Sequence, residues 1–135
     1  MSAIAKKYKN VKRNIAVRRS KAGLGLSTEK PIEKDGFVLE YKGPILTREQ
    51  AEKKGGRYLF DINSRRTIDG SSRKNFARYI NHSCKPNSVV EVEKKRIFIY
   101  SKRAIKPGEE IAYHYGKEYF DDVIKPLGCK CSFHA

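Results

Sequence analysis

The chain has 135 residues, of which 39% are hydrophobic, and it carries 30 Lys and Arg against 15 Asp and Glu, a formal net charge of +15. This length predicts one domain with a modest core and excludes two full cores. No apolar run is long enough to span a bilayer, and the start lacks the apolar core of a signal peptide, so we expect an intracellular protein that is not secreted.

The number of cysteines indicates which kinds of cysteine site the chain can contain. Three cysteines are present, and an odd number argues against a disulfide framework. It is typical of reduced thiols or of a metal site.

The N-terminal end is strongly basic and holds no acidic residue up to position 21. Its basic residues are Lys6, Lys7, Lys9, Lys12, Arg13, Arg18, Arg19 and Lys21. Such a charge favours association with polyanions such as DNA. The alternative is a solvated basic face that only keeps the protein soluble. Residues 1–12 are predicted to form a basic N-terminal tail.

Strands and turns are predicted in the first part of the chain. Residues 14–20 (NIAVRRS) are typical of a strand, and residues 21–28 (KAGLGLST) of a glycine-containing turn. Residues 37–43 (FVLEYKG) predict a second strand that ends at a Gly-Pro pair.

One helix is predicted within residues 45–56 (ILTREQAEKKGG). Thr47 is placed to cap it, and Gln50 occupies the capping-box position three residues later. The pair Gly55-Gly56 is expected to end it.

Two hairpins and one further strand follow. Residues 57–62 and 66–69 are predicted to pair across the turn at Asn63-Ser64, and residues 88–105 to form a hairpin that turns at residues 93–95. A segment with alternating side chains then follows a Pro-Gly turn. Many short strands with little helix predict a mostly β architecture.

Glycines and tyrosines mark two segments as candidates for ligand binding. Gly23 and Gly25 allow the backbone to approach a ligand closely, although such a pair is also common in a plain turn. The dinucleotide fingerprint is absent, because its third glycine and following helix are missing. Tyr113 and Tyr115 fall on one face of a strand-like segment, for which an amphipathic edge strand is the alternative.

Two more segments carry residue types that bind metals or ligands. The stretch ARYINHSCKPNS, residues 77–88, brings an amide, an imidazole and a thiol together in a turn, a metal site or a ligand pocket. At the end of the chain, Cys129, Cys131 and His134 form a zinc half-site that Cys84 could complete. The alternative is three free thiols.

In this order, the segments resemble the SET-domain protein-lysine methyltransferases. KAGLGLST is similar to the glycine motif of that family, LEYKG to its E-Y-x-G strand, and RYLFDI and TIDG to its Y-x-F-D and I-D-A stretches. ARYINHSCKPN resembles the family's R-F-I-N-H-S-C-x-P-N motif, and GEEIAYHYG resembles G-E-E-L-x-Y-D-Y. The resemblance covers nearly all of the chain, from about Asn14 to Cys131.

The resemblance implies a fold and a domain organisation. The fold would be the SET fold, with several small β-sheets, few short helices and a knot-like C-terminal threading. Residues 13–127 would form the SET domain and residues 128–135 a post-SET-like tail.

It also implies S-adenosylmethionine-dependent methylation of lysine in a protein substrate, such as a histone or another DNA-associated or nucleoid protein, with mono- and dimethyl-lysine as products. A nuclear, chromatin or nucleoid setting follows from such a substrate. The catalytic tyrosine would be Tyr115, with Tyr41 and Tyr58 as channel walls and Tyr113 setting the degree of methylation.

The expected cofactor contacts are Ala22, Gly23, Leu24, Arg78, Asn81, His82, Tyr115 and Phe133, with Arg78 also expected to hold a nearby carboxylate. The expected zinc ligands are Cys84, Cys129, Cys131 and His134.

Methyl transfer requires a neutral lysine, whose pKa in water is about 10.4. A narrow aromatic channel beside a positive sulfur disfavours the ammonium form, excludes water and aligns the reacting atoms.

Two positions depart from the family pattern, and two other functions stay open. His114 stands where the family has Asp, which bears on either substrate preference or loop packing, and no third cysteine follows the C-x-C pair. The alternatives are a non-catalytic SET-like scaffold that binds nucleic acid through its basic surface and a small zinc-binding nucleic-acid module. Cofactor binding would distinguish the enzyme from both.

Overall fold

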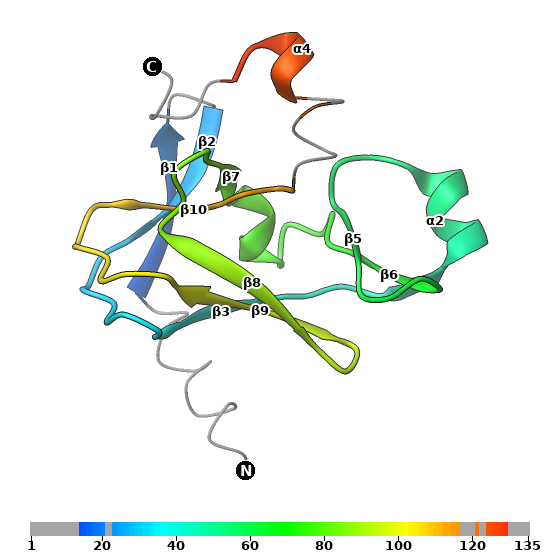
Figure 1. The fold of residues 1–135 in the computed structure, drawn as a ribbon, viewed down its shortest axis with the longest axis horizontal. Coiled ribbons are helices and arrows are strands. Elements are labelled where there is room, and N and C mark those ends of the chain that lie inside the picture. The colour runs from blue at the N-terminus through cyan, green and yellow to red at the C-terminus, as the bar shows by residue number, and fades with distance from the viewer. Residues whose placement is uncertain (1–13, 21–22, 117–120, 122–123, 130–135) are drawn as a thin grey trace.

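The computed structural model describes residues 14–20, 23–116, 121 and 124–129 (Figure 1). Its strands form three small sheets, which confirms the mostly β architecture. The strands are β1 (Ile15–Ser20), β2 (Gly23–Thr28), β3 (Phe37–Tyr41), β4 (Ile45–Thr47), β5 (Leu59–Asp61), β6 (Arg66–Asp69), β7 (Asn81–His82), β8 (Ser88–Glu93), β9 (Arg96–Ser101) and β10 (Glu110–Tyr113). The helices are α2 (Arg48–Lys54), the 3₁₀ helix η2 (Phe76–Tyr79) and α4 (Lys125–Leu127). None of the helices in the described ranges is long and apolar enough to cross a membrane.

The first sheet has the order β1-β2-β10-β7 and joins the two segments that carry the sequence motifs. β10 pairs antiparallel with β2 and parallel with β7, so that Ala112 lies opposite Asn81 and Tyr113 opposite His82. The N–H of Ser83 also donates to the carbonyl of Tyr113 at 3.1 Å. The strand with the tyrosines therefore lies directly beside the Asn-His pair.

Strand β2 corrects one prediction, because residues 23–28 are a strand and not a turn. Every residue of β2 pairs with one of β1, and Leu26 is completely buried. Gly25 serves close packing here, since a Cβ on it would meet the carboxylate of Glu110 and the amide of Asn81, whereas Gly23 adopts a φ of 108°. Pairing with a neighbouring strand outweighs a local turn signal.

The second sheet, β3-β9-β8, supplies much of the core. The predicted strand at residues 37–43 and the predicted hairpin at residues 88–105 are both confirmed, with Lys94 in the turn at a φ of 56°. Ile97, Phe98 and Ile99 are all buried, so β9 is covered on both faces.

The third sheet has the order β4-β6-β5, and together with α2 it forms what we call the α2 lobe, residues 45–69. Figure 1 shows this lobe projecting to one side of the molecule. The predicted hairpin is confirmed, as is the helix: Gln50 N–H donates to Thr47 Oγ1 at 3.2 Å, and Thr47 N–H to Gln50 Oε1 at 2.9 Å. Strand β4 was not predicted, since three residues before a helix cap give no clear alternation.

Helix α2 contributes no buried residue. It is fixed to β6 by an ion pair between Lys54 and the buried carboxylate of Asp69, which is hydrogen-bonded. Burial is the largest single influence and opposes ionisation of Asp69, but hydrogen bonds from Lys54 and Ser71 and the charge of Lys54 together lower the pKa of this carboxyl. The capping box and this one pair therefore hold the helix in place.

The C-terminal threading stays a prediction. Residues 117–120, 122 and 123, which would form the threaded loop, lie outside the described residues. The division into a tail, a SET domain and a post-SET-like segment also stays a prediction.

Candidate functional site

A cavity of about 170 Å³ lies between the first sheet and the α2 lobe. All four tyrosines that the sequence singled out line it. Among the described residues, the lining is Tyr41, Gly56, Arg57, Tyr58, Leu59, Phe60, Ala77, Arg78, Ile80, Tyr113 and Tyr115. Segments far apart in the chain thus build one aromatic cavity.

Tyr41 forms the buried wall of this cavity. Its hydroxyl donates to the carbonyl of Tyr58 at 2.6 Å, and its ring lies 5.4 Å from that of Phe60. Gly70 leaves room for the ring, since a Cβ there would overlap it. Burial, and then the neighbouring Tyr115 and Asp69, raise the pKa of Tyr41 well above its usual value. Tyr41 therefore stays neutral and acts as a fixed wall.

Tyr115 is fixed at both ends. Its hydroxyl donates to the carbonyl of Ile80, and its backbone N–H donates to Nδ1 of His82 at 3.0 Å. Its ring lies 5.2 Å from that of Tyr113 and 5.5 Å from the imidazole of His82. The hydroxyl therefore has a defined position at the cavity wall, beside a carbonyl oxygen.

Tyr58 lies between two arginines. Nη2 of Arg57 donates to its hydroxyl at 2.8 Å, and the Arg57 and Arg78 guanidiniums lie 4.9 and 4.4 Å from its ring centroid. Burial is the largest single influence and opposes ionisation of the phenol, but the hydrogen bonds and charges of Arg78 and Arg57 together lower the pKa of Tyr58. The two guanidiniums therefore place positive charge beside the phenol of Tyr58 at the cavity.

The expectation that Arg78 holds a carboxylate stays a prediction, which the described residues do not support. None of the ion pairs between them includes Arg78. Its guanidinium lies against the rings of Tyr58 and Tyr79 instead, and its buried Nε has no hydrogen-bond partner. A guanidinium can exchange an ion pair for contact with aromatic faces, which sequence alone does not reveal.

The Asn-His segment lies on the other side of Tyr115, next to β2. Asn81 Nδ2 reaches the carbonyl of Leu24 at 2.9 Å, Oγ of Ser20 at 3.1 Å and Oε2 of Glu110 at 2.8 Å. The side chain of Leu24 is 53% exposed, and Gly23 has a φ of 108°. This strip offers the apolar surface and backbone polar groups that a nucleoside cofactor needs, so its residues fit the expected group. Ala22 and Phe133 lie outside the described residues.

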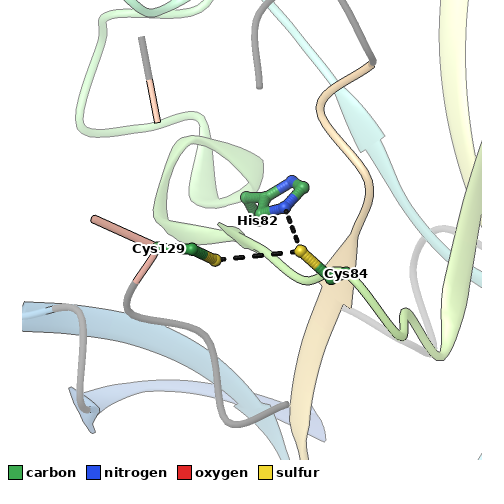
Figure 2. A group of neighbouring side chains, drawn as sticks. All are labelled: His82, Cys84 and Cys129. Atoms are coloured by element: carbon green, nitrogen blue, oxygen red, sulfur yellow. Dashed lines mark hydrogen bonds between the residues drawn. The ribbon is translucent and has the colours of Figure 1, made fainter. Parts of the chain in front are cut away.

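His82, Cys84 and Cys129 form a cluster beside this strip (Figure 2). Sγ of Cys84 lies 3.8 Å from Sγ of Cys129 and 3.3 Å from Nε2 of His82. Two thiolates bound to one tetrahedral zinc, each at about 2.3 Å, lie about 3.8 Å apart. The two sulfurs therefore fit a zinc ion, while Cys131 and His134 lie outside the described residues.

The hydrogen bonds of His82 argue against its being a zinc ligand. Its Nδ1 accepts from the backbone N–H of Tyr115, so the neutral ring carries its proton on Nε2 and points it at Cys84. Binding zinc through Nε2 would require a proton on Nδ1, facing a fixed donor. Sequence analysis assigned His82 to the cofactor and Cys84 to the metal, and the structure places the two side chains in contact.

His114, which stands where the family has Asp, packs against His82 with ring centroids 4.5 Å apart. Its Nδ1 accepts from the N–H of Gly116 at 2.9 Å. The contact with His82 joins β7 to the segment after β10, so His114 takes part in the packing of these two segments.

Six lining residues of the cavity were not predicted from the sequence: Gly56, Arg57, Leu59, Phe60, Ala77 and Ile80. Phe60 had a usable signal, because it lies two residues after Tyr58 and so shares its face of a strand. Arg57 had none, since nothing distinguishes it from the many other basic residues.

We expect zinc to bind at Cys84 and Cys129. Protein purified without chelator should contain about one equivalent of tetrahedral zinc by elemental analysis, and Cys84→Ser should reduce this to a small fraction. A wild-type protein with only traces of zinc would instead favour free thiols, for which both cysteines should react with a thiol reagent before and after chelation.

Comparisons with known proteins agree with this geometry. The SET domain family matches residues 23–116. Histone-lysine N-methyltransferase 2D of Homo sapiens is 41% identical over 133 residues, which cover 89% of this chain and 2% of that protein. Histone-lysine N-methyltransferase ATXR7 of Arabidopsis thaliana is 42% identical over 118 residues, 78% of this chain and 8% of that protein. Histone-lysine N-methyltransferase SUV39H2 of Xenopus tropicalis is 36% identical over 111 residues, 69% and 27% of the two chains. The chain thus spans about a quarter or less of the length of these relatives.

Proposed function

Since this chain belongs to the SET-domain family, we propose that it transfers methyl groups from S-adenosylmethionine to lysine side chains of a protein substrate. The observation that carries the proposal is the junction of two sites. Tyr115 lines the aromatic cavity and also donates its N–H to His82 of the Asn-His segment. A lysine in the cavity and a cofactor on the β2 strip would meet at this residue.

The residues on the cofactor side act by positioning. Asn81 joins β7 to the backbone of Leu24, and His82 fixes the backbone at Tyr115. When bound, S-adenosylmethionine supplies an electrophilic methyl group on a sulfonium. The hydroxyl of Tyr115 and the carbonyl of Ile80 are adjacent oxygens, suited to weak contacts with polarised C–H groups.

The residues on the lysine side select and align the nucleophile. The ring of Tyr41 is buried and fixed, Tyr113 is also buried, and Tyr58 is partly exposed. A cavity of this kind excludes water from the amine and restricts its orientation. The walls also make the ammonium form of lysine costly, because burial disfavours charge.

Histones are the substrate that we propose first. Relatives along most of this chain carry the name histone-lysine N-methyltransferase, and a histone substrate would place the protein in the nucleus on chromatin. A nucleoid or other DNA-associated basic protein would offer similar lysines.

The function is tested by incubation with labelled S-adenosylmethionine, core histones and a cell extract, followed by mapping of labelled lysines. Calorimetry with the cofactor analogue S-adenosylhomocysteine separates the alternatives. A nucleic-acid-binding scaffold or a zinc module would bind neither cofactor nor analogue and would label nothing.

Tyr113 is expected to limit the number of methyl groups. Its hydroxyl, in a cavity of about 170 Å³, can bind the lysine nitrogen or a water beside it and so occupy space that further methyl groups need. The wild type should give mono- and dimethyl-lysine, and Tyr113→Phe should shift products toward trimethyl-lysine by mass spectrometry. Efficient trimethylation by the wild type would remove this role from Tyr113.

The basic N-terminal segment is expected to bind DNA. Retention on DNA at low salt should weaken when the charge is reversed at Lys6, Lys7, Lys9 and Lys12, all of which lie outside the described residues. If each of the four contacts a phosphate, the slope of log K against log salt should fall by about 3 to 4. The matched control reverses four exposed lysines elsewhere, Lys34, Lys94, Lys95 and Lys102. Equal losses in the two variants would mean that only net charge matters.

A further inference from the structure

The cysteine cluster beside the cofactor strip holds two sulfurs that can also react with each other. Cys84 follows β7 and Cys129 follows α4, 45 positions later in the chain. Figure 2 shows their side chains pointing toward one another, and the two sulfurs lie 3.8 Å apart without a disulfide between them. Both residues are partly exposed, so a small oxidant can reach them from solvent.

A disulfide between these two sulfurs requires only a small movement. The S–S bond is about 2.05 Å long, and the sulfurs would close to that length from 3.8 Å. A change of rotamer at one cysteine moves its sulfur further than this. The separation that suits two ligands of one zinc ion therefore also suits oxidation of the same pair. The two outcomes exclude each other, because the metal binds thiolates and a disulfide contains none.

We propose that Cys84 and Cys129 are a peroxide-sensitive pair, which oxidation converts from zinc ligands into a disulfide. One sulfur attacks the O–O bond of hydrogen peroxide, which breaks to give a sulfenic acid and water. The second sulfur attacks the sulfenic acid, so that the S–S bond forms and a second water leaves. Two thiols and one peroxide thus give one disulfide and two waters. Where zinc holds the sulfurs as thiolates, solvent supplies the two protons and the zinc ion is released.

A single imidazole connects this pair to Tyr115, where the two proposed binding sites meet. Nε2 of His82 lies 3.3 Å from Sγ of Cys84, and Nδ1 of the same ring accepts from the N–H of Tyr115 at 3.0 Å. A thiolate accepts strongly from an N–H on Nε2, and a neutral disulfide sulfur only weakly. Oxidation should therefore loosen the ring that fixes Tyr115 and slow methyl transfer. This last step rests on the proposed function, whereas the disulfide does not.

Trypsin separates the three cysteines, so the linked pair can be identified directly. Cleavage after lysine and arginine, which spares Lys-Pro bonds, places Cys84 in residues 79–94, Cys129 in residues 118–130 and Cys131 in residues 131–135. Protein purified without chelator is treated with a slight molar excess of hydrogen peroxide, alkylated and digested without reductant. Mass spectrometry should find residues 79–94 joined to residues 118–130, and dithiothreitol should separate them.

Three further measurements follow the same treatment. A chromogenic chelator should detect zinc released in proportion to the linked fraction, and methyl transfer to core histones should fall in the same proportion. Reduction followed by added zinc should restore both. Because the link joins residues 45 positions apart, it should stabilise the fold. The oxidised protein should therefore melt no lower than reduced protein from which a chelator has removed the zinc.

Two variants identify the reacting cysteines. Cys131→Ser keeps both members of the pair and should still form the link between residues 79–94 and 118–130. Cys129→Ser removes one member and should form no disulfide between peptides. Each variant is compared with its own untreated form. The chain has one methionine, Met1, and no tryptophan, so few side chains other than cysteine consume the peroxide.

The outcomes distinguish this proposal from the proposed function. A disulfide that includes residues 131–135, or oxidation of the cysteines to sulfinic acid without any disulfide, overturns the pair. Linked protein with undiminished methyl transfer overturns the connection to Tyr115. No methyl transfer by the untreated wild type to histones or to proteins of the extract overturns the proposed function, while the peptide map still decides whether the pair forms.

Discussion

Replacing Tyr115 by Phe is expected to reduce kcat by about two orders of magnitude, the usual cost of removing one oriented hydrogen-bonding group from an active site. The hydroxyl of Tyr115 is held against the carbonyl of Ile80, where the two proposed binding sites meet. Its backbone N–H bond to His82 survives the substitution. Binding of S-adenosylhomocysteine, measured by calorimetry, should therefore change little.

Tyr100→Phe is the matched control for this variant. Tyr100 lies on β9, packs against Phe37 and does not line the cavity. The Tyr100→Phe variant loses one tyrosine hydroxyl, just as Tyr115→Phe does. Because this hydroxyl lies outside the cavity lining, the turnover of Tyr100→Phe should equal that of the wild type. Unchanged turnover in Tyr115→Phe would remove this hydroxyl from the mechanism. Removing one hydrogen bond should cost about 1 kcal/mol of stability. A fall in Tm that corresponds to a much larger loss would point to a structural role for the hydroxyl.

Replacing Gly43 by Ala is expected to lower the free energy of unfolding by about 3 kcal/mol, at the upper end of the cost of overpacking. Gly43 connects β3 to β4, and an added Cβ would overlap the backbone carbonyl of Asp69. Backbone cannot move aside as a flexible side chain can, because Asp69 N–H is bonded to the carbonyl of Pro44. Urea denaturation of the wild type and the variant measures this difference in the free energy of unfolding.

Gly56→Ala provides the control for Gly43→Ala. Gly56 has a φ of 101°, and nothing lies within 4 Å of an added Cβ. This variant carries backbone strain alone and should cost about 1 to 2 kcal/mol. A loss from Gly43→Ala no larger than that from Gly56→Ala would mean that the chain relaxes around the added methyl group.

Most of the regular structure could be predicted from local patterns. The helix cap at Thr47 and the hairpin turn at Lys94 are encoded by neighbouring residues, and both are found. Strand β2 could not be predicted, because its pairing with β1 and β10 comes from outside the segment. A pair of glycines has the same local meaning in a turn and in a tightly packed strand.

The same distinction applies to the site. Motifs identified the four tyrosines and Asn81, but not how they meet, because the parallel pairing of β10 with β7 joins residues about thirty positions apart. Side chains that act through charge or stacking were not predictable. The contact of the Arg78 guanidinium with the ring of Tyr58 was not expected, since the sequence does not distinguish an arginine that stacks on a ring from one that pairs with an acid.

Among the described residues, the cavity is built mainly from β3, β5 and the segment before it, η2 and the end of β10, and it takes no residue from α2. Helix α2 buries none of its residues and depends on its capping box and on Lys54. The solvent-facing positions of this helix can therefore vary over generations with little effect on stability. A lineage could change the surface beside the cavity while the tyrosine-lined interior stays as it is.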